Sequence, residues 1–358
     1  MRMPYGVLAG CAALILSDLG SATDAAAKAK IIEFDAPHAY TTRNLDHNMN
    51  ENGDLVGYYF KGNGRHLYAF VRTRNGDFFD LAASLPEPEP YGINVHGETT
   101  GQDRPHKGFI THRDGSVTVF RVPGTDNSGF GTRSVAIDEE GNVAGYFSYP
   151  RETNVHGFLR KKNGKIRKFD APNSGTQELQ GTYVEAMNSS GIIAGWVVDE
   201  NNVAHGYLRA PDGTFTMVDM SNAGTGPDQG TWVTDVNESG TVSGYFVNSK
   251  NTSHGFLRDS AGNVTYINVD KAGDGPFQGT SARAINNNND VTGYYQDAAF
   301  VYHGYVRFAS GKIKKFDPPD ALLDYEDGTF PADINDRGDI SGGYDGTDNE
   351  THGFLRKP

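Results

Sequence analysis

A unit of 44 to 50 residues recurs along almost the entire chain, and this period constrains the fold more than any other feature. Each copy contains a glycine that is followed, in most copies, by an aromatic residue. The intervals are 44, 44, 50, 49, 49 and 49 residues, and the marker glycines are Gly57, Gly101, Gly145, Gly195, Gly244, Gly293 and Gly342. A period of this length, rich in short β patterns, is typical of the blades of a β-propeller.

One copy contains the four strands that a blade requires. Segments 280–286, 290–295, 303–308 and 312–317 have strand-like patterns. Short turns connect the first pair and the last pair, and a longer loop connects the second strand to the third. The sequence therefore predicts an all-β fold, a seven-bladed β-propeller of four-stranded antiparallel blades.

The two ends of the chain are predicted to meet in one blade. The chain ends just after the third strand of the last copy, and residues 31–37 (IIEFDAP) match the fourth-strand segment 166–172 (IRKFDAP). We expect the N-terminal strand to complete the last blade, which closes the ring and leaves no exposed sheet edge. The propeller domain is predicted to span residues 28–358.

Residues 1–27 have the pattern of a signal peptide. A positive charge precedes the apolar run 5–16, which is too short to span a bilayer, and small residues follow it. Cleavage after Ala22 or Ala27 would leave a secreted or periplasmic protein without cysteine, excluding disulfides and thiol catalysis. Cys11, the only cysteine, lies in a segment similar to a lipoprotein signal, so a lipid anchor at this residue is the alternative.

The charge of the chain excludes two classes of partner. The formal net charge is −13, whereas nucleic-acid binding requires a basic surface and docking on anionic lipid requires basic clusters. We therefore expect no nucleic-acid partner and no membrane contact beyond a lipid anchor. The 20 Phe, 18 Tyr and 2 Trp residues argue for a folded chain.

The repeating motif resembles a known family. Ala-Ile-Asn at 284–286 and Val-Thr-Gly-Tyr at 291–294 represent its first half, and His-Gly-Phe-Leu-Arg at 254–258 and Phe-Asp-Ala-Pro at 169–172 its second. Together they resemble the HAF repeat of bacterial extracellular proteins. The resemblance covers essentially the whole chain after the signal segment. It implies an exported β-propeller and no particular reaction.

Two polar positions recur in nearly every copy, and we interpret both as structural. One set starts a tight turn, Asn-x-x-Gly in most copies, in which a short polar side chain bonds its own backbone; it comprises Asn50, Asn94, Asp138, Asn188, Asn237, Asn286 and Asn335. The other set is expected to form repeated hydrogen bonds between strands, because zinc ligands must converge whereas blades fan out; it comprises His156, His205, His254, His303 and His352.

The long loops are predicted to share one face, and they contain nearly all of the excess negative charge. The acidic residues concentrate around the last blade, at Asp320, Asp324, Glu326, Asp327, Asp345, Asp348 and Glu350. Either this is a solvated acidic rim, or it is an oxygen-rich funnel suited to Ca²⁺.

Side chains near the start of each inner strand differ from copy to copy and are the candidates for function. Five residues before the turn, and three before it, lie on one side of the strand. The predicted ligand-binding residues are Tyr91, Arg133, Tyr183, Trp232 and Phe330; the catalytic candidates are His47, Glu185 and Arg283; the metal candidates are Glu185, Asp235 and Asp333. The alternative is that these side chains only pack between blades.

Two functions follow from this pattern. The leading prediction is a Ca²⁺-dependent hydrolase of small esters or lactones, in which the cation polarises a carbonyl and a His or Glu activates water. The sequence has no motif for serine chemistry, zinc proteolysis or nucleotide binding, so no nucleotide or organic cofactor is expected. The alternative is a non-catalytic extracellular module that binds a glycan, a peptide or a small molecule.

Overall fold

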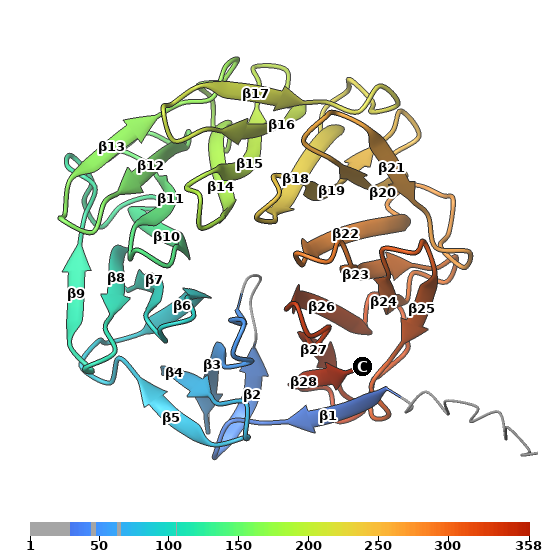
Figure 1. Ribbon diagram of the computed structural model, residues 1–358, viewed down its shortest axis with the longest axis horizontal. Coiled ribbons are helices and arrows are strands. Elements are labelled where there is room, and N and C mark those ends of the chain that lie inside the picture. The colour runs from blue at the N-terminus through green and yellow to red at the C-terminus, as the bar shows by residue number, and fades with distance from the viewer. Residues whose placement is uncertain (1–28, 44–47, 63–65, 105) are drawn as a thin grey trace, which may run out of the picture.

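The computed structural model describes residues 29–43, 48–62, 66–104 and 106–358, and this part of the chain is all-β without a helix. Its 28 strands surround a central axis (Figure 1), and they are the number that seven four-stranded blades require. Four separate sheets each contain four antiparallel strands. We call each antiparallel group of four strands a blade.

The first three blades follow one another along the chain. They consist of β2 (Ala39–Arg43), β3 (Leu55–Lys61), β4 (Leu67–Arg72) and β5 (Phe78–Leu81); of β6 (Pro88–Ile93), β7 (Thr99–Asp103), β8 (Lys107–Thr111) and β9 (Val117–Phe120); and of β10 (Thr132–Ile137), β11 (Val143–Phe147), β12 (His156–Arg160) and β13 (Ile166–Phe169).

The next three groups belong to one twelve-stranded sheet. Within it, single parallel pairs, Ala204 with Gly230 and Ser253 with Gly279, join the three antiparallel groups. The groups are β14 (Gly181–Met187), β15 (Ile193–Val198), β16 (Ala204–Arg209) and β17 (Phe215–Val218); β18 (Gly230–Val236), β19 (Val242–Val247), β20 (Ser253–Arg258) and β21 (Val264–Ile267); and β22 (Gly279–Ile285), β23 (Val291–Gln296), β24 (Tyr302–Arg307) and β25 (Ile313–Phe316).

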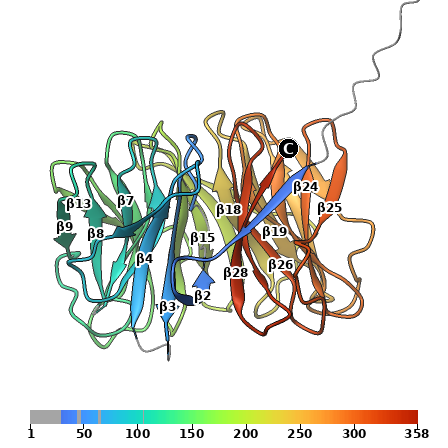
Figure 2. The same ribbon diagram turned by 90° about the horizontal axis from the view of Figure 1, so that it is seen from below.

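The last blade unites the two ends of the chain. It contains β26 (Thr329–Ile334), β27 (Ile340–Asp345) and β28 (Thr351–Lys357), and β1 (Lys30–Phe34) pairs with β28 in the antiparallel sense, with Ile32 opposite Leu355. Figures 1 and 2 show β1 lying along the outer side of β28. The predicted closure of the last blade by the first strand is thus confirmed, and the four strands predicted in 280–317 agree with β22 to β25 within two residues.

The inner strand of each blade, the one nearest the axis, contains an irregularity that explains the marker glycines. In β18 the pairing with β19 shifts between Val233 and Asp235, which is a β-bulge. This brings the backbone of β18 so close to β19 that a Cβ on Gly244 would lie 2.1 Å from the carbonyl oxygen of Trp232. A side chain is excluded there by this close approach, so the repeated glycine is required.

The hydrophobic core lies between blades rather than within them. One cluster joins Ala194 of β15 to Val233 of β18 and Phe256 of β20, and comparable clusters occupy the other interfaces. Because each blade buries one face against each neighbour, its residues are shielded only when the adjacent blades are in place.

The recurring asparagines connect the blades around the axis. Asn237 Oδ1 accepts hydrogen bonds from the backbone N–H groups of Ser239 and Thr241, as predicted for the turn, and its Nδ2 donates to the carbonyl of Asn286 in the next blade. The same donation to the next blade recurs at Asn50, Asn94, Asn188 and Asn286. The second bond, between blades, was not predicted from the sequence.

The recurring histidines connect strands within a blade, as predicted. His303 Nδ1 lies 2.9 Å from Asp317 Oδ2 at the end of β25, and its Nε2 lies 3.7 Å from Asp297 Oδ2 in the loop before β24. His156, His205 and His352 have equivalent acidic partners on both sides. His254 faces Asn248 and Asn268 instead.

The predicted signal peptide, with Cys11, lies outside the described residues. Within them, no helix is long and apolar enough to cross a bilayer.

Candidate functional site

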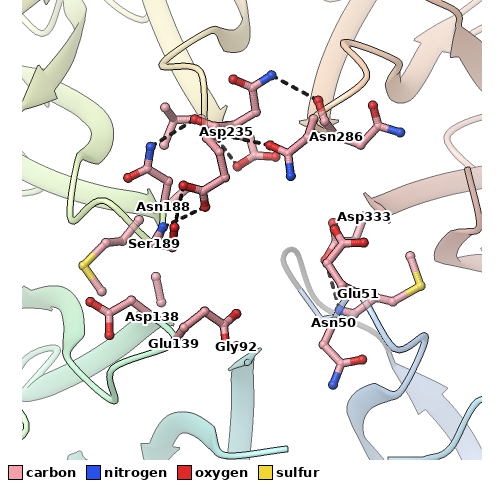
Figure 3. A pocket seen from close by; sticks show the side chains of 18 of the residues that line it. Asn50, Glu51, Gly92, Asp138, Glu139, Asn188, Ser189, Asp235, Asn286 and Asp333 are labelled. Atoms are coloured by element: carbon pink, nitrogen blue, oxygen red, sulfur yellow. Dashed lines mark hydrogen bonds between the residues drawn. The ribbon is translucent and has the colours of Figure 1, made fainter. Parts of the chain in front are cut away.

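A small recess of about 190 Å³ lies on the ring axis, at the end formed by the tight turns of the inner strands (Figure 3). Partial desolvation at this recess raises the pKa of Glu51 and of Glu139, since a carboxylate that loses hydration is a weaker acid. Its acidic lining residues are Glu51, Asp138, Glu139, Asp235, Glu238 and Asp333. The metal candidates Asp235 and Asp333 therefore reach the axis, but at the end opposite to the long loops.

The carboxylates of Asp235 and Asp333 hold neighbouring inner strands together. Asp235 accepts hydrogen bonds from the backbone N–H of Val236, at 2.7 Å, and from that of Ile285 on β22, at 2.9 Å. Asp333 accepts the backbone N–H groups of Ile334, at 2.8 Å, and Met49, at 3.0 Å. These buried carboxylates stabilise the ring by satisfying backbone donors beside the bulges, a role that the sequence reasoning missed.

The third metal candidate lies elsewhere. Glu185 Oε1 accepts a hydrogen bond of 2.8 Å from Trp196 Nε1, and Glu185 is not part of the axial lining. In the described ranges of the chain, no group of three His, Cys, Asp or Glu side chains is placed to hold a metal ion. Glu185, Asp235 and Asp333 are thus not brought together, and the Ca²⁺ site stays a prediction.

The catalytic candidates are also apart. His47 lies outside the described residues. Arg283 is the half-buried bulge residue of β22, whereas Glu185 is the bulge residue of β14. The inner strand β18 lies between these two strands (Figure 1).

Most of the predicted ligand-binding residues belong to an aromatic network that is already packed. Tyr183 stacks on Trp196 with ring centroids 4.0 Å apart, and its hydroxyl donates to the carbonyl of Leu179. Tyr91 is buried beneath the Arg133 guanidinium, 4.3 Å from the ring centroid. Burial also raises the pKa of Tyr91. The contacts of Tyr91, Arg133 and Tyr183 thus favour the alternative interpretation, that these side chains pack between blades rather than bind a ligand.

Trp232 borders an open pocket of about 400 Å³ between the β18–β21 blade and the β22–β25 blade, which we call the inter-blade pocket. Its aromatic lining residues are Trp232, Tyr245, Phe277, Tyr294 and Tyr302, and its polar ones are Asp228, Asn251, Ser253, Gln278, Ser281 and Gln296. Several of them lie on the long loops, the face on which the sequence predicted function. The volume and the mixture of aromatic and a few polar groups are typical of ligand pockets.

A single small side chain leaves this pocket open. Ser281 occupies the inner-strand position at which the neighbouring blades have Trp232 and Phe330. In the next interface, the Phe330 ring lies 4.9 Å from that of Tyr302 and 5.8 Å from that of Tyr294 and occupies the equivalent space. Trp232 itself stacks parallel to Tyr245, with ring centroids 5.1 Å apart. Phe330, the fifth predicted ligand-binding residue, therefore packs behind two pocket residues rather than lining the pocket.

The wall of the pocket contains an unsatisfied acceptor. Gln296 is only 4% exposed, and its Nε2 donates to the carbonyl oxygen of Phe300 at 3.1 Å. Because that oxygen only accepts hydrogen bonds, the amide nitrogen must face it, which fixes the orientation of the carboxamide. Gln296 Oε1 is buried and has no hydrogen-bond partner among the residues that the structure describes.

An exposed aromatic residue with an unusual backbone conformation forms the rim of the pocket. Phe277 is 75% exposed and has a φ of 66°. Leu179, Asp228 and Glu326 have the same left-handed backbone in the equivalent loops. A bulky apolar side chain is disfavoured both by exposure and by a positive φ, and such costs concentrate at functional sites.

Sequence reasoning found Trp232 but missed the rest of the pocket. Tyr245 and Tyr294 follow marker glycines, so they belong to the repeating pattern and are not distinguished from scaffold residues by sequence. The signal that would have found the site is side-chain size: Ser281 is the one small residue at its position among the described blades.

No protein-family model and no curated protein matches this sequence. Among solved structures, puromycin hydrolase superposes with a TM-score of 0.56 at 11% identity, covering 87% of this chain and 52% of that chain. The β-propeller domain of the Trilobed protease from Pyrococcus furiosus has a TM-score of 0.52 at 10% identity, covering 87% of this chain and 95% of that one.

A third solved structure, Porphyromonas gingivalis dipeptidyl peptidase 4, has a TM-score of 0.44 at 11% identity, covering 83% of this chain and 50% of that one. This chain thus spans about half the length of puromycin hydrolase and of the dipeptidyl peptidase. At such identities the likeness concerns the fold alone. On its strand topology and its superpositions with puromycin hydrolase and the Trilobed protease domain, the chain is a β-propeller protein.

Proposed function

We propose that this chain is an exported, seven-bladed β-propeller that binds a small ligand in the inter-blade pocket. The observation that carries this proposal is Ser281, whose small side chain leaves open one interface, whereas Trp232 against Trp196 and Phe330 against Tyr302 fill the interfaces on either side. The aromatic walls provide apolar contact area, and the polar groups between them provide orientation.

Filling the pocket tests the proposal. Ser281→Tyr introduces a tyrosine, which the β14–β17 blade already has at the equivalent position, Tyr183, so the fold should tolerate the substitution. We would titrate both proteins with a panel of neutral sugars, dipeptides and small amines and follow tryptophan fluorescence, to which Trp196 and Trp232 contribute. A wild-type response that disappears in Ser281→Tyr supports the pocket, whereas equal responses in both proteins contradict it.

The Ca²⁺-dependent hydrolase, predicted at the acidic face of the long loops, stays a second, separate candidate. Its metal candidates Asp235 and Asp333 line the acidic axial recess at the opposite end, so the test addresses that recess. We expect EDTA to leave the melting temperature unchanged, because Asp235 and Asp333 are already engaged by backbone N–H groups. Thermal unfolding with EDTA, and with added CaCl₂, checks this. Stabilisation by Ca²⁺ together with Ca²⁺-dependent turnover of ester or lactone substrates would instead favour the hydrolase.

A further inference from the structure

We infer that the ligand of the inter-blade pocket is an uncharged carbohydrate ring with a free hydroxyl directed at Gln296. This inference rests on the proposed function and adds the chemical class of the ligand. It follows from three properties of the pocket: its aromatic faces, its lack of cationic groups and its unsatisfied acceptor.

The aromatic faces suit a ring whose own faces are C–H groups. Trp232 and Tyr245 stack parallel, 5.1 Å apart, on one wall, and Tyr294 and Tyr302 form the other with centroids 5.5 Å apart. An aromatic face has a negative quadrupole, so it attracts the polarised C–H groups of a pyranose as well as burying them. The same walls would also suit a quaternary ammonium group, which the polar residues must therefore discriminate.

Hydrogen bonding and the absence of basic side chains favour the carbohydrate. The one charged residue in the described lining, Asp228, can accept hydrogen bonds from sugar hydroxyls but would also attract a cation. None of the described lining residues is Lys, Arg or His, so no group is available to pair with a carboxylate or a phosphate. Gln296 Oε1 requires a donor, because a buried unsatisfied oxygen destabilises the protein. A sugar hydroxyl can donate to this oxygen once a small shift of the Gln296 side chain exposes it to the pocket, whereas a quaternary ammonium group has no N–H or O–H to offer.

The rim indicates that the ligand extends out of the pocket. Phe277 presents an exposed ring at the mouth, held there by a hydrogen bond of 2.7 Å from its backbone N–H to the carbonyl of Asn251. A second sugar ring linked to the first would lie against this face. We therefore expect disaccharides to bind more tightly than monosaccharides, and the difference to depend on Phe277.

The test uses the full chain and defined probes: a series of neutral monosaccharides and disaccharides, with choline and glucuronate as the competing classes. Calorimetry or tryptophan fluorescence would give the affinities. We expect at least one neutral sugar to bind, choline and glucuronate to give no response, and Gln296→Leu to weaken sugar binding about tenfold. Phe277→Ala should reduce the disaccharide advantage, whereas Phe79→Ala, at an exposed phenylalanine on β5, should not.

The outcomes separate the two proposals. A response to choline without a response to any sugar, or sugar binding that is unchanged in Gln296→Leu, overturns the carbohydrate assignment. Ligand binding in the inter-blade pocket would still stand in that case if Ser281→Tyr abolishes the response. No response to any probe overturns both proposals. Unaltered melting temperatures of Gln296→Leu and Ser281→Tyr ensure that a lost response reports the pocket rather than unfolding.

Discussion

Gly244 shows how strongly one position depends on its neighbour's backbone. A Cβ at this residue would lie 2.1 Å from the Trp232 carbonyl oxygen and 2.8 Å from the Phe256 ring. Gly244→Ala therefore forces β18 and β19 apart. We expect a loss of about 1–3 kcal/mol in the free energy of unfolding, measured by urea titration.

Gly343 is the matched control, because it is also a strand glycine, yet an added Cβ would meet only ordinary contacts at 3.5 and 3.8 Å. Gly343→Ala should leave the unfolding midpoint nearly unchanged. Equal effects of the two substitutions would show that the close approach at Gly244 is not what requires glycine.

At the residue scale, the positions of side chains were easier to predict from the sequence than their hydrogen-bond partners. Asp235 and Asp333 were expected near the axis and are there, but the bulges direct their carboxylates to backbone N–H groups of the next inner strand. Their partners Ile285 and Met49 lie 50 and 284 residues away along the chain. Patterns within one repeat contain no information about contacts between repeats. Likewise, Ser281 indicates an open pocket only when all copies of the repeat are aligned.

At the scale of the elements, a histidine–aspartate pair joins the third and fourth strands of most blades. The hydrogen bond and charge of Asp317, with a smaller contribution from Asp297, raise the pKa of His303, although burial opposes this. The folded-state pKa thus exceeds that of the unfolded chain. The stabilisation is fully present below about pH 6.5 and disappears as the pH rises through the folded-state pKa.

We therefore expect the stability advantage of the wild type over His303→Gln to be larger near pH 6 than at pH values above the folded-state pKa, measured by urea unfolding at several pH values. His254→Gln is the matched control for loss of a histidine at this position, since the partners of His254, Asn248 and Asn268, are uncharged amides. A flat profile for His303→Gln would contradict a charged pair.

The elements themselves were predictable because each blade repeats the same local signals. The turn of four asparagines at 286–289 and alternating patterns located β22 to β25 within two residues. The bulges were not predictable, since Glu185 and Arg283 are ordinary strand residues in sequence and only the pairing register identifies them as extra residues.

At the scale of the whole molecule, β1 determines whether the ring is closed. Ile32 is paired with Leu355 and packs with Met49 of the adjacent blade, so it contacts both sides of the closure. Ile32→Asp should lower the free energy of unfolding by about 1–3 kcal/mol. Lys30→Ala, at the exposed end of the same strand, should have little effect. Urea unfolding distinguishes the two, and equal midpoints would show that closure contributes nothing to stability.

The ring architecture and its closure were the most predictable properties, because both are encoded by self-similarity: the period of the repeat and the match between residues 31–37 and 166–172. Function was the least predictable, since a repeat sequence emphasises what its copies share. The pocket exists because two adjacent copies differ, and the side chains that line it come from strands about 50 residues apart.

Ser281 also suggests how such a ring diversifies. Serine codons of one family differ from those of tyrosine and phenylalanine by a single base, so one point mutation in a duplicated copy is enough to exchange a filled interface for an open one. The remaining copies preserve the ring through their turn asparagines and bulge contacts while that interface changes. Each blade boundary is thus a separate locus at which a lineage can gain or lose a binding site without rebuilding the fold.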